Sequence, residues 1–210
     1  MNDKPAGKRT ASNSPCSHIQ VPSIFGDIVI VWEGTSESSP IQLRRIYLPN
    51  EKTSALSRAR QDFENLVCES MDDPPLIMRI IINIIQSTLT GIPADRSCVD
   101  AILETTPLSP FARRALSLEA RIPHGHVSSY RALAEATGNP RAVRAVAHVL
   151  SENPFPLLIP CHRVIASNGA LAGFQGGLAM KQYLLGREGI PFLPDSRVDL
   201  TRAQFWTFSS

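Results

Sequence analysis

The residues most able to do chemistry stand side by side, with a cysteine followed by a histidine and an arginine: Cys161, His162 and Arg163. Three of the seven residues from 154 to 160 are prolines, which excludes regular secondary structure there and imposes a stiff, extended approach to the cysteine. The two basic neighbours create a locally positive field, which favours the nucleophilic thiolate. We therefore predict that Cys161 is reactive, although a free cysteine is most often buried and inert.

The order of these residues also sets a geometric condition. Successive side chains of an extended chain point to opposite faces, so Cys161 and His162 are badly placed for the direct sulfur-to-imidazole bond of a cysteine protease. A water between them, or a turn at this point, is needed to connect them.

A glycine-rich loop follows at residues 173–177. Its glycines allow a flat ligand or another backbone to come close. The spacing differs from the Gly-x-Gly-x-x-Gly fingerprint after a hydrophobic strand, which argues against a dinucleotide site.

Upstream, two helices are expected over residues 129–137 and 140–151, joined through Gly138. The second helix carries Arg141 and Arg144, and the pair fits a helix-turn-helix. Simple burial of two packed helices is the competing interpretation.

Other elements must hold these segments in place. Capping signals predict a helix over 111–121 with Ser109 as N-cap, and glycine-rich flanks predict another over 178–187. In the first half of the chain we expect a hairpin of strands 28–32 and 41–48, and a buried helix 76–89 that is capped by Asp73 and ends at Gly91.

Composition narrows the class of protein. The chain has 210 residues, of which 43% are hydrophobic and 19% are charged. It can therefore bury a hydrophobic core, and intrinsic disorder of the whole chain is excluded. Residues 1–107 carry a net charge of −3, whereas residues 108–190 carry +5, which points to a polyanionic partner such as nucleic acid; an ordinary solvated face is the alternative interpretation. Four cysteines without a Cys-x-x-Cys pair suggest neither a disulfide scaffold nor a zinc site.

We expect no membrane contact and no secretion. Residues 1–17 lack the apolar core of a signal peptide, and the helix over 76–89 is too short for a span of roughly 20 residues.

Taken together, the motifs resemble those of the O6-alkylguanine-DNA alkyltransferases over about residues 107–190. The motifs that carry the resemblance are Val127-Ser128-Ser129-Tyr130, Asn139-Pro140-Arg141-Ala142-Val143-Arg144-Ala145-Val146, Ile159-Pro160-Cys161-His162-Arg163-Val164, Gly173-Phe174-Gln175-Gly176-Gly177 and Glu188-Gly189.

The resemblance implies a role for each matching residue. Cys161 is implied to accept the alkyl group from O6 of guanine, and His162 to act through a water as its base, oriented by Glu188. Tyr130 is implied to contact the rotating nucleotide and to protonate the leaving guanine, and Asn153 to brace the turn. The resemblance also implies DNA-binding residues, namely Arg144 as the residue that fills the base stack, Tyr130, Arg141, Ser129 and Ala145, and an alkylguanine pocket formed by Pro156, Val164, Gly173, Phe174, Gln175 and Gly176.

The expected fold is α+β, a small mixed α/β domain followed by a mainly helical domain with a helix-turn-helix. The boundaries are a disordered tail over 1–18, an N-terminal α/β domain over 19–106, an alkyltransferase DNA-binding domain over 107–190, and an extension over 191–210. The resemblance implies a monomer that repairs double-stranded DNA from the minor groove, once per molecule, in a nucleus or nucleoid, with no cofactor and no metal. Two alternatives are a non-catalytic protein that recognises alkylation damage, and a cysteine hydrolase that uses Cys161 and His162.

Overall fold

The N-terminal part of this computed structural model is built on a four-stranded sheet; the structure describes residues 16–34, 40–69 and 71–208. The strand order is β3-β2-β1-β4, antiparallel except that β4 runs parallel to β1. The strands are β1 (Cys16–Val21), β2 (Ile28–Glu33), β3 (Gln42–Tyr47) and β4 (Leu66–Cys68). The hairpin predicted from the sequence is confirmed as β2 and β3.

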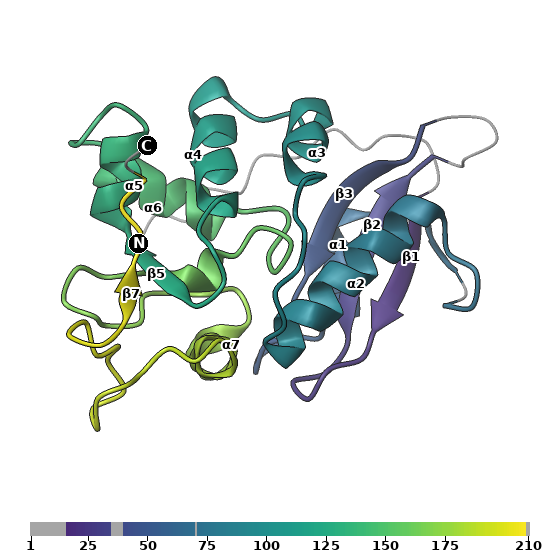
Figure 1. Cartoon of the computed structure of the whole chain (residues 1–210). Helices are drawn as coiled ribbons and strands as arrows, with labels where there is room; N and C mark the ends of the chain where they lie inside the picture. The colour runs from purple at the N-terminus through teal and green to yellow at the C-terminus, as the bar shows by residue number, and fades with distance from the viewer. Residues whose placement is uncertain (1–15, 35–39, 70, 209–210) are drawn as a thin grey trace, which may run out of the picture.

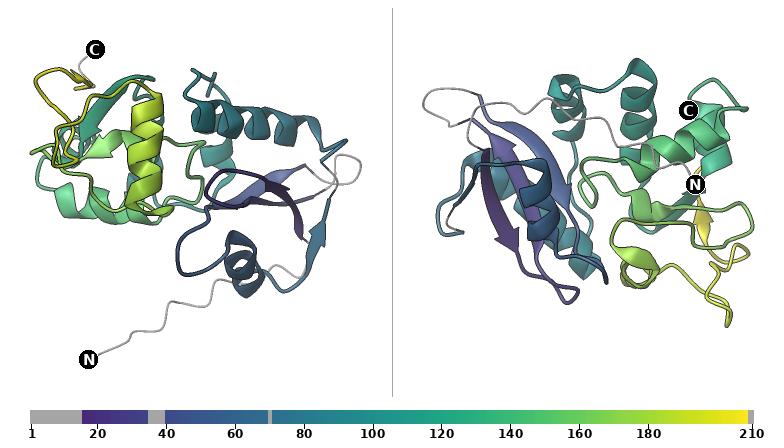
Figure 2. Two further views of the ribbon diagram at one scale, coloured as in Figure 1. Left: turned by 90° about the horizontal axis from the view of Figure 1, so that it is seen from below. Right: turned by 180° about the vertical axis from the view of Figure 1, so that it is seen from behind.

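Strand β2 is apolar on both faces because a helix covers each of them. Its even-numbered side chains, such as Ile30, pack on α2 (Leu76–Thr90), while Val29 and Val31 pack on α1 (Ala55–Asp62). The two helices accordingly lie on opposite faces of the sheet (Figure 1, Figure 2). This alternation is the period-two pattern of a strand that is buried on both sides.

Helix α2 begins at Leu76 and ends just before Gly91 as predicted, but its N-cap is not the predicted residue. Its N-cap is Pro75, which makes no side-chain capping bond, so the prediction that Asp73 caps the helix is wrong. Asp73 instead lies 3.6 Å from Arg79 in an exposed ion pair. Gly91 ends the helix in the left-handed conformation with φ 73°, and a Cβ at this position would lie 2.2 Å from the backbone oxygen of Arg187. Glycine is therefore required there both for its φ and for the close approach.

The C-terminal part is mainly helical and carries a small parallel sheet of order β6-β5-β7. Figure 1 shows the C-terminal part lying beside the N-terminal sheet, with α3 on the side next to β3. Its elements are α3 (Val99–Thr105), α4 (Pro110–Ala120), β5 (His126–Ser129), α5 (Tyr130–Ala136), α6 (Val143–Ser151), the 3-10 turn η1 (Cys161–Arg163), β6 (Val164–Ile165), α7 (Gly177–Arg187) and β7 (Gln204–Phe205).

Caps define the ends of the helices near the site. Ser109 accepts a hydrogen bond from the backbone N–H of Ala112, as predicted for the start of α4, and Ser129 caps α5 in the same way. Helix α6 begins at Val143 rather than at residue 140, because residues 139–142 form a turn closed by a 2.9 Å bond between the Ala142 N–H and the Asn139 oxygen. The helix-turn-helix pair is thus α5 and α6.

The largest core joins the two parts of the chain. It contains sheet residues such as Ile46, residues of α2, and C-terminal residues such as Phe155 and Leu184. The predicted division at residue 107 therefore separates segments that share one core, and it stays a prediction.

Both ends of the described part of the chain are tied to sheets. Strand β1 begins at Cys16, so residues 16–18 belong to the sheet rather than to the predicted tail, the rest of which lies outside the described residues. The extension adds β7 to β5, where the Trp206 N–H donates to the Val127 oxygen at 2.8 Å and the Ser128 hydroxyl donates to the Trp206 oxygen at 2.8 Å. Within the described ranges, no helix has the length and hydropathy to cross a membrane.

Candidate active site

Cys161 opens the short turn η1, in which the Val164 N–H donates back to the Cys161 carbonyl. This turn is one of the two solutions required by the sequence, because it removes the strict alternation of an extended chain. The cysteine is 7% exposed and His162 is 0% exposed. The nucleophile therefore lies within the protein, with little of its surface open to solvent.

Asn153 braces the loop that leads to the cysteine. Its Oδ1 accepts from the Phe155 N–H at 2.9 Å, its Nδ2 donates to the Ile159 oxygen at 3.5 Å, and its side chain also bonds with Cys161. Leu157 within the same loop has a φ of 70°, which a residue with a side chain adopts only when its surroundings hold it there. These contacts fit the bracing role implied for Asn153.

The same loop is held from the N-terminal part by Arg96. Its Nε donates to the Leu158 oxygen at 3.1 Å, and its Nη2 donates to the Thr88 hydroxyl at 2.7 Å. Burial, together with the nearby Arg163, lowers the pKa of Arg96 to about 10, so the side chain stays charged at neutral pH. No sequence motif pointed to Arg96, because 62 residues separate it from its loop partner.

Behind the cysteine, Glu188 joins a histidine and an arginine. Its Oε1 lies 2.8 Å from His162 Nε2 and 2.8 Å from Arg163 Nη2, and its Oε2 accepts from Arg163 Nε at 2.9 Å. Burial raises the pKa of Glu188, but the hydrogen bonds from these two side chains outweigh it and hold the pKa far below its usual value. The carboxylate is ionised and acts as a fixed acceptor.

His162 is neutral in this setting. Burial lowers its pKa to about 4, although Glu188 acts in the opposite direction. Since Nε2 faces a carboxylate, we assign the ring proton to Nε2, which leaves a lone pair on Nδ1. This buried Nδ1 has no hydrogen-bond partner among the residues that the structure describes. It is the free base of the site.

The prediction that His162 and Arg163 favour the thiolate of Cys161 is wrong. Burial and the charge of Glu119 raise the pKa of the thiol to about 12, whereas Lys181 acts in the opposite direction. His162 carries no charge, and the charge of Arg163 is matched by Glu188. The resting cysteine is therefore a thiol rather than the expected thiolate.

The sequence interpretation missed two buried charged groups near the thiol, Glu119 of α4 and Lys181 of α7. Lys181 donates to the Val164 oxygen at 2.7 Å and to the Ala172 oxygen at 3.1 Å. A signal was present in the sequence, because Glu119 lies on the apolar face of its helix, three residues after Leu116.

Tyr130 is the first residue of α5, at the junction between β5 and the helix-turn-helix. Burial raises the pKa of its hydroxyl to about 12, with further contributions from Glu119 and Cys161. Tyr130 and Cys161 are hence near enough to influence each other electrostatically, as a shared site requires.

The residues expected to bind DNA divide into two groups. Arg141, Arg144 and Ala145 are exposed, at or just before the start of α6. Ser129 is buried and its hydroxyl accepts from the Ala132 N–H, so that side chain is committed to the cap of α5.

The expected pocket residues differ in their burial and in their contacts. Pro156 and Val164 are buried, and the Phe174 ring lies edge-on to His162 with 6.4 Å between centroids. Gln175 donates to the Asn153 oxygen at 2.7 Å. Gly173 is exposed, while a Cβ on Gly176 would lie 2.3 Å from the Met180 sulfur.

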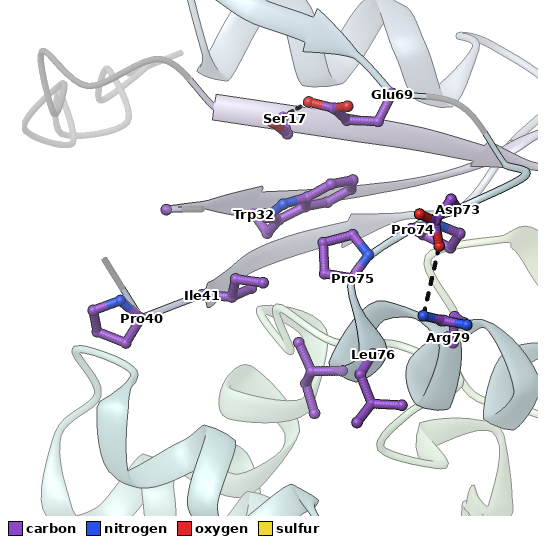
Figure 3. A pocket seen from close by; sticks show the side chains of 12 residues that line it. Ser17, Trp32, Pro40, Ile41, Glu69, Asp73, Pro74, Pro75, Leu76 and Arg79 are labelled. Carbon is purple, nitrogen blue, oxygen red and sulfur yellow. Dashed lines mark hydrogen bonds and ion pairs between the residues drawn. The ribbon is translucent and has the colours of Figure 1, made fainter. Parts of the chain in front are cut away.

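A separate hollow of about 800 Å³ lies at the start of α2, remote from the cysteine. It is lined by residues of the N-terminal part, among them Trp32, Ile41 and Leu76 (Figure 3). The described residues contain no group of three or more His, Cys, Asp or Glu side chains placed to hold a metal ion.

Part of this chain is similar in sequence to known proteins. The DNA-binding domain of the 6-O-methylguanine DNA methyltransferases matches residues 110–190. The human methylated-DNA–protein-cysteine methyltransferase is 49% identical over 80 residues, which is 38% of this chain and 39% of the human protein. The enzyme of the same name from Methanothermobacter thermautotrophicus is 38% identical over 117 residues, which is 56% of this chain and 64% of that protein.

In fold, the similarity extends beyond residues 110–190. The crystal structure of Mycobacterium tuberculosis OGT in complex with DNA aligns with a TM-score of 0.56 and 23% identity, and covers 82% of this chain and 92% of that one. The predicted α+β class and the family resemblance are both confirmed. In sequence, the chain spans less than two thirds of the length of the two methyltransferases that it matches.

Proposed function

We propose that this chain repairs DNA by direct reversal, as a methylated-DNA–protein-cysteine methyltransferase that moves an alkyl group from O6 of guanine onto Cys161. The observation that carries the proposal is the arrangement of Cys161 beside a neutral His162 that Glu188 orients, inside an alkyltransferase domain.

The transfer forms one bond and breaks another. Sγ of Cys161 attacks the alkyl carbon, the bond from that carbon to O6 breaks, and the electron pair leaves with guanine. The thiol proton goes through a water to Nδ1 of His162, whose lone pair is free to accept it. Tyr130 gives its hydroxyl proton to the leaving guanine, and its pKa of about 12 keeps that proton in place until charge develops on the base.

The proposed reaction ends after one turnover. Its product is a thioether, which water does not hydrolyse. The other cysteines, Cys16, Cys68 and Cys98, lie in the N-terminal half of the chain, and no resolving thiol accompanies Cys161 in its motif.

Double-stranded DNA is the proposed partner. Exposed Arg141 and Arg144 and the net charge of +5 over residues 108–190 suit phosphate contacts from the minor groove, with Ala145 and Tyr130 beside the lesion. Because Cys161 is 7% exposed, the damaged base must leave the stack to reach it, and Arg144 fills the vacated space. The M. tuberculosis relative was crystallised in complex with DNA, which agrees with this partner.

The proposed alkylguanine pocket lies between the turn and the glycine-rich loop, walled by Pro156, Val164 and residues 173–176. We further propose that the protein acts as a monomer, in a nucleus or nucleoid where its substrate lies.

A stoichiometry experiment tests the function. Excess duplex that carries O6-methylguanine is incubated with the protein, and the repaired lesions are counted at the plateau. We expect one repaired lesion per protein molecule, and none with Cys161→Ser. A damage-recognition protein would repair none, and a hydrolase would continue past one, so either result would refute the proposal.

A further inference from the structure

Glu119 is a buried acid to which the proposed function gives no role. It lies on the inner face of α4 with 0% exposure, beside Ala115 and Leu116. Neither of its carboxyl oxygens has a hydrogen-bond partner within the described part of the chain. Burial of an unpartnered carboxyl group opposes folding, and an apolar residue would fill this position at lower cost.

The groups around Glu119 belong to the transfer site. Its charge acts on Tyr130 at the start of α5, on Cys161 in η1, and on Lys181 of α7. Three residues on different elements thus lie close enough to Glu119 for their charges to interact with it. Lys181 is fixed by two carbonyl acceptors, one of them the Val164 oxygen at the end of η1, so the position of its charge beside the turn is set by the fold.

The two buried charges act on the sulfur in opposite directions. A negative charge on Glu119 disfavours the thiolate of Cys161, whereas the ammonium group of Lys181 favours it. We propose that Glu119 is a positioning residue that acts through Cys161, so that with Lys181 its protonation state sets how readily the thiol ionises for alkyl transfer. This inference rests on the proposed function.

The protonation states predict how the effect varies with pH. Burial raises the pKa of Glu119 to about 8, and burial lowers that of Lys181 to about 8. Below that pH the acid is neutral and the ammonium is charged, which favours the thiolate. Above it the acid ionises and the ammonium loses its proton, so the thiolate is disfavoured just where alkalinity would otherwise produce more of it.

Glu119→Gln isolates the charge, because glutamine has nearly the same shape but does not ionise. We would measure the rate of benzyl transfer to Cys161 from free O6-benzylguanine, which needs no DNA contact. We expect the ratio of variant to wild-type rate to be near one at about pH 6.5 and to reach about threefold or more at about pH 9, equivalent to a shift of about half a unit in the pKa of the thiol. Glu104→Gln, which changes an exposed acid on α3, should keep a ratio near one at every pH.

A second variant keeps the test decisive if Glu119→Gln does not fold. Glu119→Met removes the charge and fills the site with apolar atoms, so it should fold at least as stably and show the same pH-dependent ratio. A ratio that stays constant with pH in the folded variants would mean that Glu119 has only a structural role, and would overturn the inference.

The experiment also separates this inference from the proposed function. If wild-type protein transfers benzyl at no pH and also repairs no O6-methylguanine in duplex DNA, the proposed function fails. In that case, alkylation of Cys161 by iodoacetamide, followed by peptide mapping, still tests the effect of Glu119 on the thiol. The same pH-dependent ratio would support that effect, and a constant ratio would refute it.

Discussion

The Nε2 atom of His162 lies 2.8 Å from Oε1 of Glu188, and both side chains are buried. This contact fixes the orientation of the imidazole and directs its free nitrogen, Nδ1, away from the acid. Arg163 binds the same carboxylate, so the acid remains charged while the histidine remains neutral. One buried ion pair thereby keeps a base available next to the nucleophile.

Glu188→Gln should destabilise the protein strongly. The substitution leaves the guanidinium of Arg163 buried without its counter-charge, and the loss of one partner of a buried ion pair costs about 3–5 kcal/mol. Urea unfolding measures the free energy of unfolding. The exposed acid of α5 provides the control, since Glu135→Gln should change that energy by less than about 0.5 kcal/mol. Equal stability of the two variants would show that the buried pair is not needed.

Mild acid should weaken the fold through His162. The unfolded chain binds a proton on this histidine near its ordinary pKa of 6.5, whereas the folded protein does so only near 4. The free energy of unfolding should therefore fall as the pH drops from about 6.5 towards 4, by up to about 3 kcal/mol.

Between about pH 6.5 and 5, the change in the free energy of unfolding comes from His162 rather than from Glu188. The pKa of that acid is depressed in the folded state, so its stabilising contribution is present above its unfolded value of about 4.5 and is lost only at lower pH. His162→Gln should remove most of the slope in this window. A wild-type protein whose stability is flat between these pH values would contradict the account.

Arg144→Ala should separate DNA repair from thiol chemistry. The side chain is exposed at the start of α6 and is proposed to fill the base stack, which would offset an unstacking cost of a few kcal/mol. We expect repair of duplex DNA to slow by tenfold or more, on the order of 1.4 kcal/mol, while benzyl transfer from free O6-benzylguanine stays unchanged. Arg60→Ala on α1 serves as the matched exposed control. Equal slowing with both substrates would refute the stack-filling role.

Arg96→Met should loosen the loop that carries the cysteine. The Leu158 oxygen and the Thr88 hydroxyl lose a buried donor, at a cost of about 1–3 kcal/mol. Because the loop supports the nucleophile itself, transfer from duplex and from free base should fall together. If only duplex repair slowed, Arg96 would instead act on DNA binding.

Much of the site could be predicted because its signals are local. The prolines before Cys161, the cap at Ser109 and the αL glycine at Gly91 each depend on neighbours within a few residues. The turn at Cys161 was one of two options that the Cys161-His162 order left open.

The parts that sequence reasoning missed depend on distant contacts. Strand β4 has three residues and exists through its pairing with β1, about 50 residues earlier. The electrostatic surroundings of Cys161 depend on Glu119 and Lys181, which only folding brings near the sulfur. Glu188 was assigned by resemblance alone, since nothing in its local sequence connects it with His162.

The most direct test of the central claim is the mass of the peptide that contains Cys161 after repair. Wild-type protein is mixed with an equimolar amount of duplex carrying O6-methylguanine, digested and examined by tandem mass spectrometry. We predict that the methyl group is found on Cys161, in the same amount as the guanine restored, and that Cys98 stays unmodified. Restored guanine with an unmodified Cys161 would contradict the account.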